Sequence, residues 1–302
     1  MFEVLSAIVS VFIVIGVGWL ARHLRVVGAG DYGKFNSFIY YVTLPALMFI
    51  SLVEAGSTSF ADLPLILSNA CAIIAMMALV VVASVLLRLP RKLASVLLIT
   101  AFFGNVVYMG YPVVELALGR EAVPVVVIVS TIYTIIIFSL GIAMLEYSSM
   151  RMKLSEILRR LLFNPLLISV LAGLGFLYLS LQLPVVLSTS LSLIGHVTAP
   201  LALLSLGIFM HGRNPLANIR LNLSVAALKM AVFPLLYIAF ARLFGLRGLG
   251  FEVSLIEAAM PIAVTNFVLA DQYKLDAELV SSAIVLTTLL SPIALLLFNA
   301  FN

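Results

Sequence analysis

Two apolar segments of the chain carry prolines, glycines and asparagines in a pattern that suits the binding of an anion. They span residues 104–112 and 260–266. Proline removes a backbone donor and clashes with the preceding turn, and glycine loosens a helix further, so each segment is predicted to break its helix. The N-terminus of a half-helix offers free N–H groups and a positive dipole end, which attract negative charge. Asn105 and Asn266 add amide groups to this predicted anion site.

The residues predicted to form the site lie at or beside the two interruptions. They are Gly104, Asn105, Tyr108, Gly110, Pro112, Pro261, Thr265 and Asn266, and residues near Pro45 are expected to face them. In the alternative interpretation the prolines only kink their helices and the asparagines only bridge neighbouring helices. An offset of 155 residues places the centre of the first interruption, Tyr108, on the centre of the second, Ala263. This symmetry favours a binding site.

Ionisable side chains inside apolar segments are costly and therefore suggest a function. Glu257, Lys229 and Glu115 are candidates for coupling proton movement to anion binding, and His196 is more typical of packing. Glu257 lies one turn before Pro261. Several alternatives stay open: Glu115 reaching the membrane surface, Glu257 pairing with Lys229 or with a backbone donor, and Lys229 extending to the surface.

These residues sit in a chain whose composition is that of a membrane protein. Of its 302 residues 64% are hydrophobic and 10% are charged, against roughly 25% charged in soluble domains. Membrane helices need about 20 apolar residues each. The apolar runs predict an all-α polytopic membrane protein with ten transmembrane helices, near 3–22, 34–54, 62–87, 93–117, 122–146, 161–180, 184–210, 221–242, 249–270 and 277–299.

The basic residues predict the orientation of these spans. With the N-terminus outside, thirteen basic residues fall in cytoplasmic loops and only Arg120, Arg242 and Arg247 fall in outer loops. Positive charge gathers on the cytoplasmic side of membrane proteins. Both termini are therefore expected to face outward. The basic loop near 147–160 is expected to lie on the inner headgroups.

The two halves of the chain resemble each other. Residues 42–45 match 197–200 at an offset of 155, and residues 16–20 match 173–177 at an offset of 157. Five spans separate equivalent points, so the second half must be inverted. The sequence predicts two inverted five-helix repeats, 1–157 and 158–302, with broken fourth and ninth helices, a design typical of secondary transporters.

Other function classes lack their characteristic residues. The four aspartates lie at span ends, no Gly-x-Ser-x-Gly motif occurs, and three histidines with one cysteine give no metal-site spacing. We therefore expect no enzyme, metal or cofactor, and no nucleic-acid partner. A passive channel or an intramembrane sensor or receptor is the alternative function. Whether protons or sodium ions couple to transport is left open.

Several motifs resemble the auxin efflux carrier (PIN-like) family. They are residues 105–112, Met260-Pro261 with Asn266, Ala270, Tyr273 and 278–282, and also Thr43-Leu44-Pro45-Ala46 and Asn164-Pro165. The resemblance implies a fold like that of bile acid–sodium symporters. It also implies a scaffold of 1–56 and 158–212, a transport domain of 62–147 and 217–300, crossed fourth and ninth helices, elevator movement of organic anions, and a homodimer formed through the scaffold helices.

By the same resemblance Asn105 contacts a substrate carboxylate. Plant members carry a second proline in the ninth span where this chain has Thr265-Asn266, which puts auxin in doubt as the substrate. The long cytoplasmic loop of plant members is absent, as in prokaryotic members, which are commonly linked to malate and other dicarboxylates. We expect a multi-pass secondary carrier in the cytoplasmic membrane that moves a small organic anion by alternating access.

Overall fold

A computed structural model describes residues 2–55, 62–141, 143–145, 155, 158, 159 and 162–299. Over these residues the chain is helical, and the only β-type pairing among them is an isolated antiparallel bridge between Gly104 and Ile262. Most of the basic loop predicted near 147–160 lies outside the described residues.

Seven helical stretches of the described chain are long and apolar enough to cross a membrane. They are Leu5–His23, Asp31–Glu54, Leu63–Leu86, Arg120–Leu145, Val185–Met210, Ile219–Leu243 and Ala277–Leu297. Each coincides with one of the predicted spans. The chain is therefore a multi-pass membrane protein, as the sequence predicted.

The other three predicted spans contain shorter helices. One holds α10 (Pro165–Tyr178), one holds α5 (Arg91–Phe102) followed by α6 (Tyr111–Leu118), and one holds α15 (Gly248–Ala259) followed by α16 (Thr265–Gln272). The last two are the segments in which interruptions were predicted. The total of ten spans stays a prediction.

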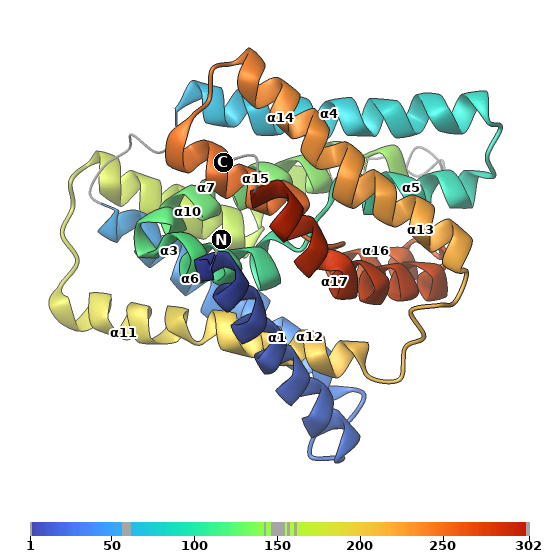
Figure 1. Ribbon diagram of the computed structural model, residues 1–302. Helices are drawn as coiled ribbons and strands as arrows, with labels where there is room; N and C mark the ends of the chain where they lie inside the picture. The colour runs from blue at the N-terminus through green and yellow to red at the C-terminus, as the bar shows by residue number, and fades with distance from the viewer. Residues whose placement is uncertain are drawn as a thin grey trace. The chain divides into compact units, whose positions relative to one another are not determined.

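The helices group into two compact units, and unit 1 comprises Met1–Asp62, Val107–Thr131 and Leu162–Gly212. Besides α6, α10 and the first part of α7 (Val123–Ile136), its elements are α1 (Phe2–His23), α2 (Asp31–Phe38), η1 (Ile39–Thr43), α3 (Leu44–Glu54), η3 (Arg120–Ala122), α11 (Val185–His196) and α12 (Thr198–Met210). Within this unit α1 packs on α12 and α6, and α3 packs on α10 and α11 (Figure 1).

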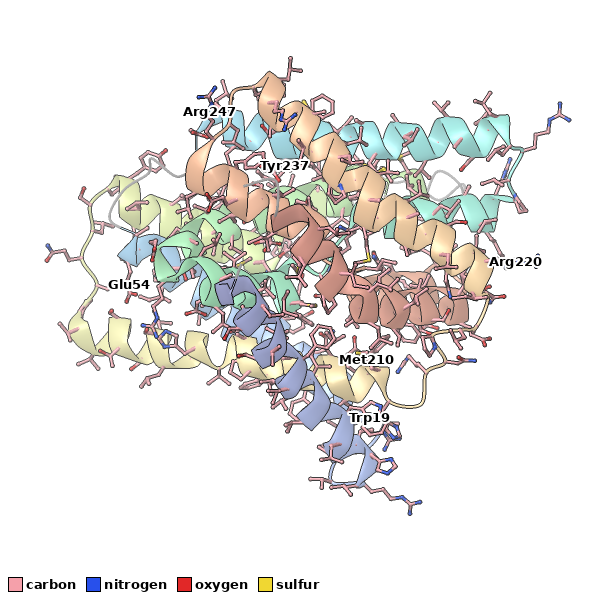
Figure 2. The ribbon with its side chains drawn as sticks, viewed as in Figure 1. Trp19, Glu54, Met210, Arg220, Tyr237 and Arg247 are labelled. Atoms are coloured by element: carbon pink, nitrogen blue, oxygen red, sulfur yellow. The ribbon has the colours of Figure 1, made fainter. Side chains whose placement is uncertain are left out.

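Unit 2 comprises Leu63–Val106, Ile132–Leu161 and Arg213–Asn302. Besides α5, α15, α16 and the end of α7, its elements are α4 (Leu63–Leu86), η4 (Ile137–Gly141), α13 (Ile219–Ala227), η5 (Leu228–Val232), α14 (Phe233–Leu243) and α17 (Ala277–Asn299). Helix α4 packs on α14 and α5, while α17 packs on α13, α15 and α16. Figure 2 shows Tyr237 at the meeting of α14 and α15, where its hydroxyl donates to the Phe251 carbonyl at 3.1 Å.

Three of the helices contain a wide π-helical turn just before a proline. The turns η1, η2 (Val106–Gly110) and η5 are followed two residues later by Pro45, Pro112 and Pro234. Proline cannot donate to the carbonyl four residues earlier, and its ring crowds that carbonyl. A π turn widens the helix at this point. These prolines therefore distort their helices without ending them.

The contact between α1 and α12 depends on two glycines. A Cβ atom at Gly18 would collide with the backbone of Leu204, and one at Gly207 would collide with the Ile15 carbonyl and the Trp19 amide. Small residues let membrane helices approach at backbone distance. By contrast, Gly16 on the same helix has no atom within 4 Å of its Cβ position.

We expect Gly18→Leu to destabilise the protein and Gly16→Leu to have little effect. Leucine at 18 must push α1 from α12, and overpacking of this kind costs about 1–3 kcal/mol or more. Thermal unfolding of the purified variants in detergent, followed by the loss of monodisperse protein, measures the difference. Equal melting temperatures for the two variants would contradict the close contact.

Candidate functional site

Both predicted interruptions are present. The residues at which the two helices are broken belong to unit 2. Helix α5 ends at Phe102 and regular structure resumes at Val106, whereas α15 ends at Ala259 and α16 begins at Thr265. The short stretches between these ends are extended or irregular. Their backbone groups have lost the intrahelical partners that membrane helices normally provide.

The two interrupted segments provide hydrogen-bond partners for each other. The Asn105 N–H donates to the Pro261 carbonyl at 2.7 Å, and the Ala263 N–H donates to the Phe103 carbonyl at 3.0 Å. Gly104 and Ile262 form the antiparallel bridge at the centre of this pairing. The segments predicted to meet therefore pair as a minimal two-stranded ladder.

Two side chains complete the pairing. The Asn266 amide nitrogen donates to the Phe103 carbonyl at 3.0 Å, so this carbonyl accepts two hydrogen bonds. Thr287 of α17 accepts a hydrogen bond from the Ile262 N–H at 3.2 Å. Ile262 and Thr287 are fully buried, where an unpaired amide would be unfavourable.

One donor and one acceptor at the interruptions have no hydrogen-bond partner among the described residues. The donor is the side-chain nitrogen of Asn105, and the acceptor is the side-chain oxygen of Asn266. Asn105 is 3% exposed and Asn266 is fully buried. Buried amide atoms in proteins are nearly always paired, so exceptions call for a functional explanation. The unpaired Asn105 nitrogen matches the chemistry of a carboxylate oxygen.

A buried lysine lies against the first interruption. The Lys229 ammonium, carried by η5, donates to the Ala258 carbonyl at 2.6 Å and lies 4.8 Å from the centre of the Phe233 ring. Its last carbon and its nitrogen lie 3.0 Å from the position that a Cβ of Gly104 would take. Residue 104 therefore has little space for a side chain while the lysine holds this position. The contact brings a positive charge beside the residue that precedes Asn105.

The structure brings together only part of the predicted site. Gly104, Asn105, Pro261 and Asn266 meet directly in unit 2, and Thr265 is the half-buried first residue of α16.

The other predicted binding residues belong to unit 1. Tyr108 donates its hydroxyl to the side-chain oxygen of Asn36. Gly110 and Pro112 are buried, and Pro45 is a half-buried residue at the start of α3.

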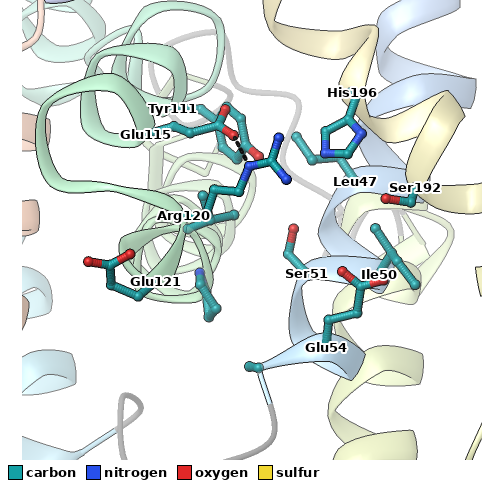
Figure 3. Close-up of a pocket in the computed structure, with 13 residues that line it drawn as sticks. Leu47, Ile50, Ser51, Glu54, Tyr111, Glu115, Arg120, Glu121, Ser192 and His196 are labelled. Atoms are coloured by element: carbon teal, nitrogen blue, oxygen red, sulfur yellow. Dashed lines mark ion pairs between the residues drawn. The ribbon is translucent and has the colours of Figure 1, made fainter.

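Unit 1 contains a pocket of about 410 Å³. Figure 3 shows Arg120 extending across it, with its guanidinium nitrogen 3.6 Å from Glu115. His196 and Ser192 of α11 and residues of α3, including Glu54, form part of its wall, and Glu121 lies on the side of Arg120. Glu115 therefore makes a partly exposed ion pair. Within the described chain, no group of three or more His, Cys, Asp or Glu residues is placed to hold a metal ion.

Sequence reasoning missed the partners that hold the interruptions. Thr287 is one of several hydroxyl-bearing residues in the last helix, and nothing in its neighbourhood in the sequence links it to Ile262. A weak signal does exist, because Thr287 and Thr288 are adjacent polar residues deep in the last span. Phe103 takes part through its carbonyl, which no sequence motif reports.

We expect Thr287→Val to destabilise the protein more than Thr288→Val. Both threonines are fully buried and each donates to a carbonyl of its own helix, but only Thr287 also accepts from the Ile262 amide. Leaving that amide unpaired costs about 1–3 kcal/mol. Thermal melting of the two isosteric variants measures the difference, and equal losses would contradict a supporting role for Thr287.

Comparison with known proteins places the chain among transporters. The family described as "Membrane transport protein" matches residues 3–299. The chain is 29% identical over 298 residues to an "Uncharacterized transporter" of Methanothermobacter thermautotrophicus, with 97% of each chain covered. It is 26% identical to a "Putative malonate transporter" of Rhizobium meliloti, covering 96% of this chain and 93% of the relative.

A plant protein is similar over the same extent. "Auxin efflux carrier component 8" of Arabidopsis thaliana is 25% identical over 351 residues, covering 96% of this chain and 95% of the relative. The family match therefore extends over nearly the whole sequence, in agreement with the motifs. The chain belongs to the membrane transport protein family, the PIN-like family of auxin efflux carriers, and is a multi-pass protein of the cell membrane.

Proposed function

We propose that the protein is a secondary carrier of small organic carboxylates and that the anion binds beside the paired interruptions. The observation that carries this proposal is the unpaired side-chain nitrogen of buried Asn105. An amide donor of this kind is suited to a carboxylate oxygen. The name of the Rhizobium meliloti relative supports this substrate class, because malonate is a small dicarboxylate.

Two further features favour an anion at this position. The Lys229 ammonium lies against Gly104 and contributes a positive charge in surroundings of low dielectric, where electrostatic attraction is strong. The first turn of α16 begins at Thr265, and a helix N-terminus attracts negative charge. The amide, the ammonium and the helix end supply complementary charge without a metal ion.

Alternating access suits this arrangement better than a permanent pore. The polar groups that would contact the anion, on Asn105 and Lys229, belong to side chains that are at most 3% exposed. A pore needs a continuous wet path lined by such groups. A carrier instead exposes a buried site to each side in turn, which in proteins with inverted repeats occurs largely by rigid-body movement. We include elevator movement in the proposal on this basis.

The pocket in unit 1 is a less favourable place for an organic anion. Its three carboxylates, Glu54, Glu115 and Glu121, outnumber Arg120, and the guanidinium is already beside Glu115. His196 adds at most one further charge. The side chain of Arg120 is also 79% exposed, so water screens its attraction. We therefore assign the principal carboxylate contact to Asn105.

We expect Asn105→Ala to weaken malonate binding about 10–100-fold and to abolish malonate counterflow in proteoliposomes. A hydrogen bond to a charged group contributes about 1.5–3 kcal/mol, which corresponds to this range. Asn69→Ala is the matched control, because the Asn69 amide is buried but already donates to Leu65 and Ser254 at 2.9 Å. That variant should lose stability and keep its affinity. Normal counterflow in Asn105→Ala would remove this residue from the site.

In the pocket, we expect Arg120→Gln to change the malonate dissociation constant by less than about threefold, because an exposed ion pair contributes little. Binding to purified protein and uptake at several malonate concentrations test this expectation. A loss as large as that of Asn105→Ala would move the anion site to the pocket. Unitary currents in a planar bilayer, in place of saturable counterflow, would favour a channel.

A further inference from the structure

Unit 2 contains two fully buried ionisable side chains that the anion contact alone does not explain. Glu257 lies in the last turn of α15 and Lys229 lies in η5, and both are 0% exposed. They do not come within ion-pair distance of each other in the described structure. Burying two ionisable groups that do not contact each other destabilises the protein. Their presence inside membrane segments therefore suggests that they have a function.

Glu257 has no hydrogen-bond partner for either carboxyl oxygen among the described residues. An ionised carboxylate buried in this way loses its hydration without compensation. Water is excluded and no donor replaces it, so the balance between the ionised and the protonated carboxyl depends on the charges that lie nearby. The carboxyl can then gain or lose a proton when the local charge changes.

The charged and titratable groups that face Glu257 are few. Lys229 from η5 and Tyr133 from α7 interact with it electrostatically. On α14, Tyr237 uses its hydroxyl to donate to Phe251. Helix α4 has no acidic or basic residue, and the acidic residue of α17, Glu278, is exposed. Lys229 is therefore the buried cation that acts on Glu257.

Lys229 connects Glu257 to the anion site through direct contacts. Its ammonium donates to the carbonyl of Ala258, the residue next to Glu257, and its end lies against Gly104, the residue next to Asn105. One side chain thus touches both interrupted segments. A change of charge at Glu257 is felt at Lys229 and at an anion beside Asn105, because little solvent lies between them to screen it.

We propose that Glu257 and Lys229 form one proton-binding site coupled to the carboxylate site, so that the protein takes up one proton as it binds the anion. With both groups protonated the pair carries one positive charge, and after losing one proton it carries none. An anion stabilises the positive state, and by linkage the proton strengthens anion binding by the same factor. The proton comes from solution and no covalent bond to the anion forms.

This inference rests on the proposed carboxylate site and adds the coupling ion to it. Transport would then be a proton–anion symport that needs no sodium. Because the two groups interact strongly, they titrate as a pair and the proton belongs to the pair. Over the range in which the pair titrates, the affinity should rise by up to about tenfold for each unit by which the pH falls.

The direct test is isothermal titration calorimetry of malonate into the wild-type protein in detergent, in two buffers of different ionisation enthalpy. The buffer dependence gives the number of protons taken up, which we expect to approach one per malonate over the pH range in which the malonate affinity itself changes with pH. The dissociation constant should not change when choline replaces sodium. A proton count near zero across this range overturns the proposal without any variant.

Three variants locate the proton. Glu257→Gln mimics the protonated carboxyl, so it should bind malonate with a dissociation constant independent of pH and near the low-pH wild-type value, and take up no proton. Lys229→Met should bind malonate at least about tenfold more weakly at every pH, because the attracting charge is gone. Glu252→Gln, on the same helix and partly exposed, is the matched control and should keep wild-type proton uptake. Wild-type uptake in Glu257→Gln overturns the assignment.

A spectroscopic readout separates this inference from the proposed function. At low pH or with malonate bound, infrared spectra of the wild-type protein should show the C=O band of a protonated carboxyl that disappears in Glu257→Gln and persists in Glu252→Gln. If the wild-type protein binds no malonate at any pH but shows this band, the substrate proposal fails and the proton site stands. If malonate binds and the band is the same in all three proteins, the proton site fails and the carboxylate site stands.

Discussion

Backbone groups at membrane depth have no water to bind, and this constraint shapes the centre of unit 2. A helix satisfies its own amides, but an interrupted helix exposes them. Here two interruptions satisfy each other through the bonds of Asn105 to Pro261 and of Ala263 to Phe103, and Thr287 supplies the acceptor that Ile262 needs. Neither break would be tolerable without the other. The pairing of two broken segments, more than the proline in either one, makes the irregular backbone stable inside the bilayer.

One atom that this pairing leaves without a partner, the side-chain nitrogen of Asn105, has the chemistry to bind an anion. Once the backbone groups are paired, the unpaired atoms at the interruptions are side-chain atoms of Asn105 and Asn266, with the Lys229 ammonium close to Gly104. A site formed in this way is preorganised, because the pairing holds these side chains in place before the anion arrives. Preorganised polar groups bind more strongly since less freedom is lost on association. In the proposed function, the requirement for structural pairing and the binding of the anion would thus fall on the same few residues.

The sequence predicted the parts of this arrangement that depend on local chemistry. Prolines and glycines in apolar runs indicated both interruptions, and a common offset indicated that the segments centred on Tyr108 and Ala263 correspond. The first break, however, lies at Gly104, and Tyr108 and Pro112 belong to the helical turns that follow it. Long-range partners were not predictable, because a threonine such as Thr287 or a carbonyl such as that of Phe103 has no local pattern that names its partner. The pairing of Glu257 with Lys229 was one of several alternatives, and the structure instead places Lys229 on the Ala258 carbonyl. The hydrogen bond between Tyr108 and Asn36 was not anticipated, because 72 residues separate them.

The same contacts favour movement of the paired interruptions as one body. To slide one segment past the other, the protein would have to break the two backbone hydrogen bonds and expose buried amides, each at a cost of about 1–3 kcal/mol. The Lys229 side chain, held between Gly104 and the Ala258 carbonyl, would have to leave its place as well. Carrying the whole assembly across the membrane breaks none of these contacts. A carrier built on mutually paired interruptions is therefore expected to give access to its site by moving the site, and to keep proton and anion together as it does so.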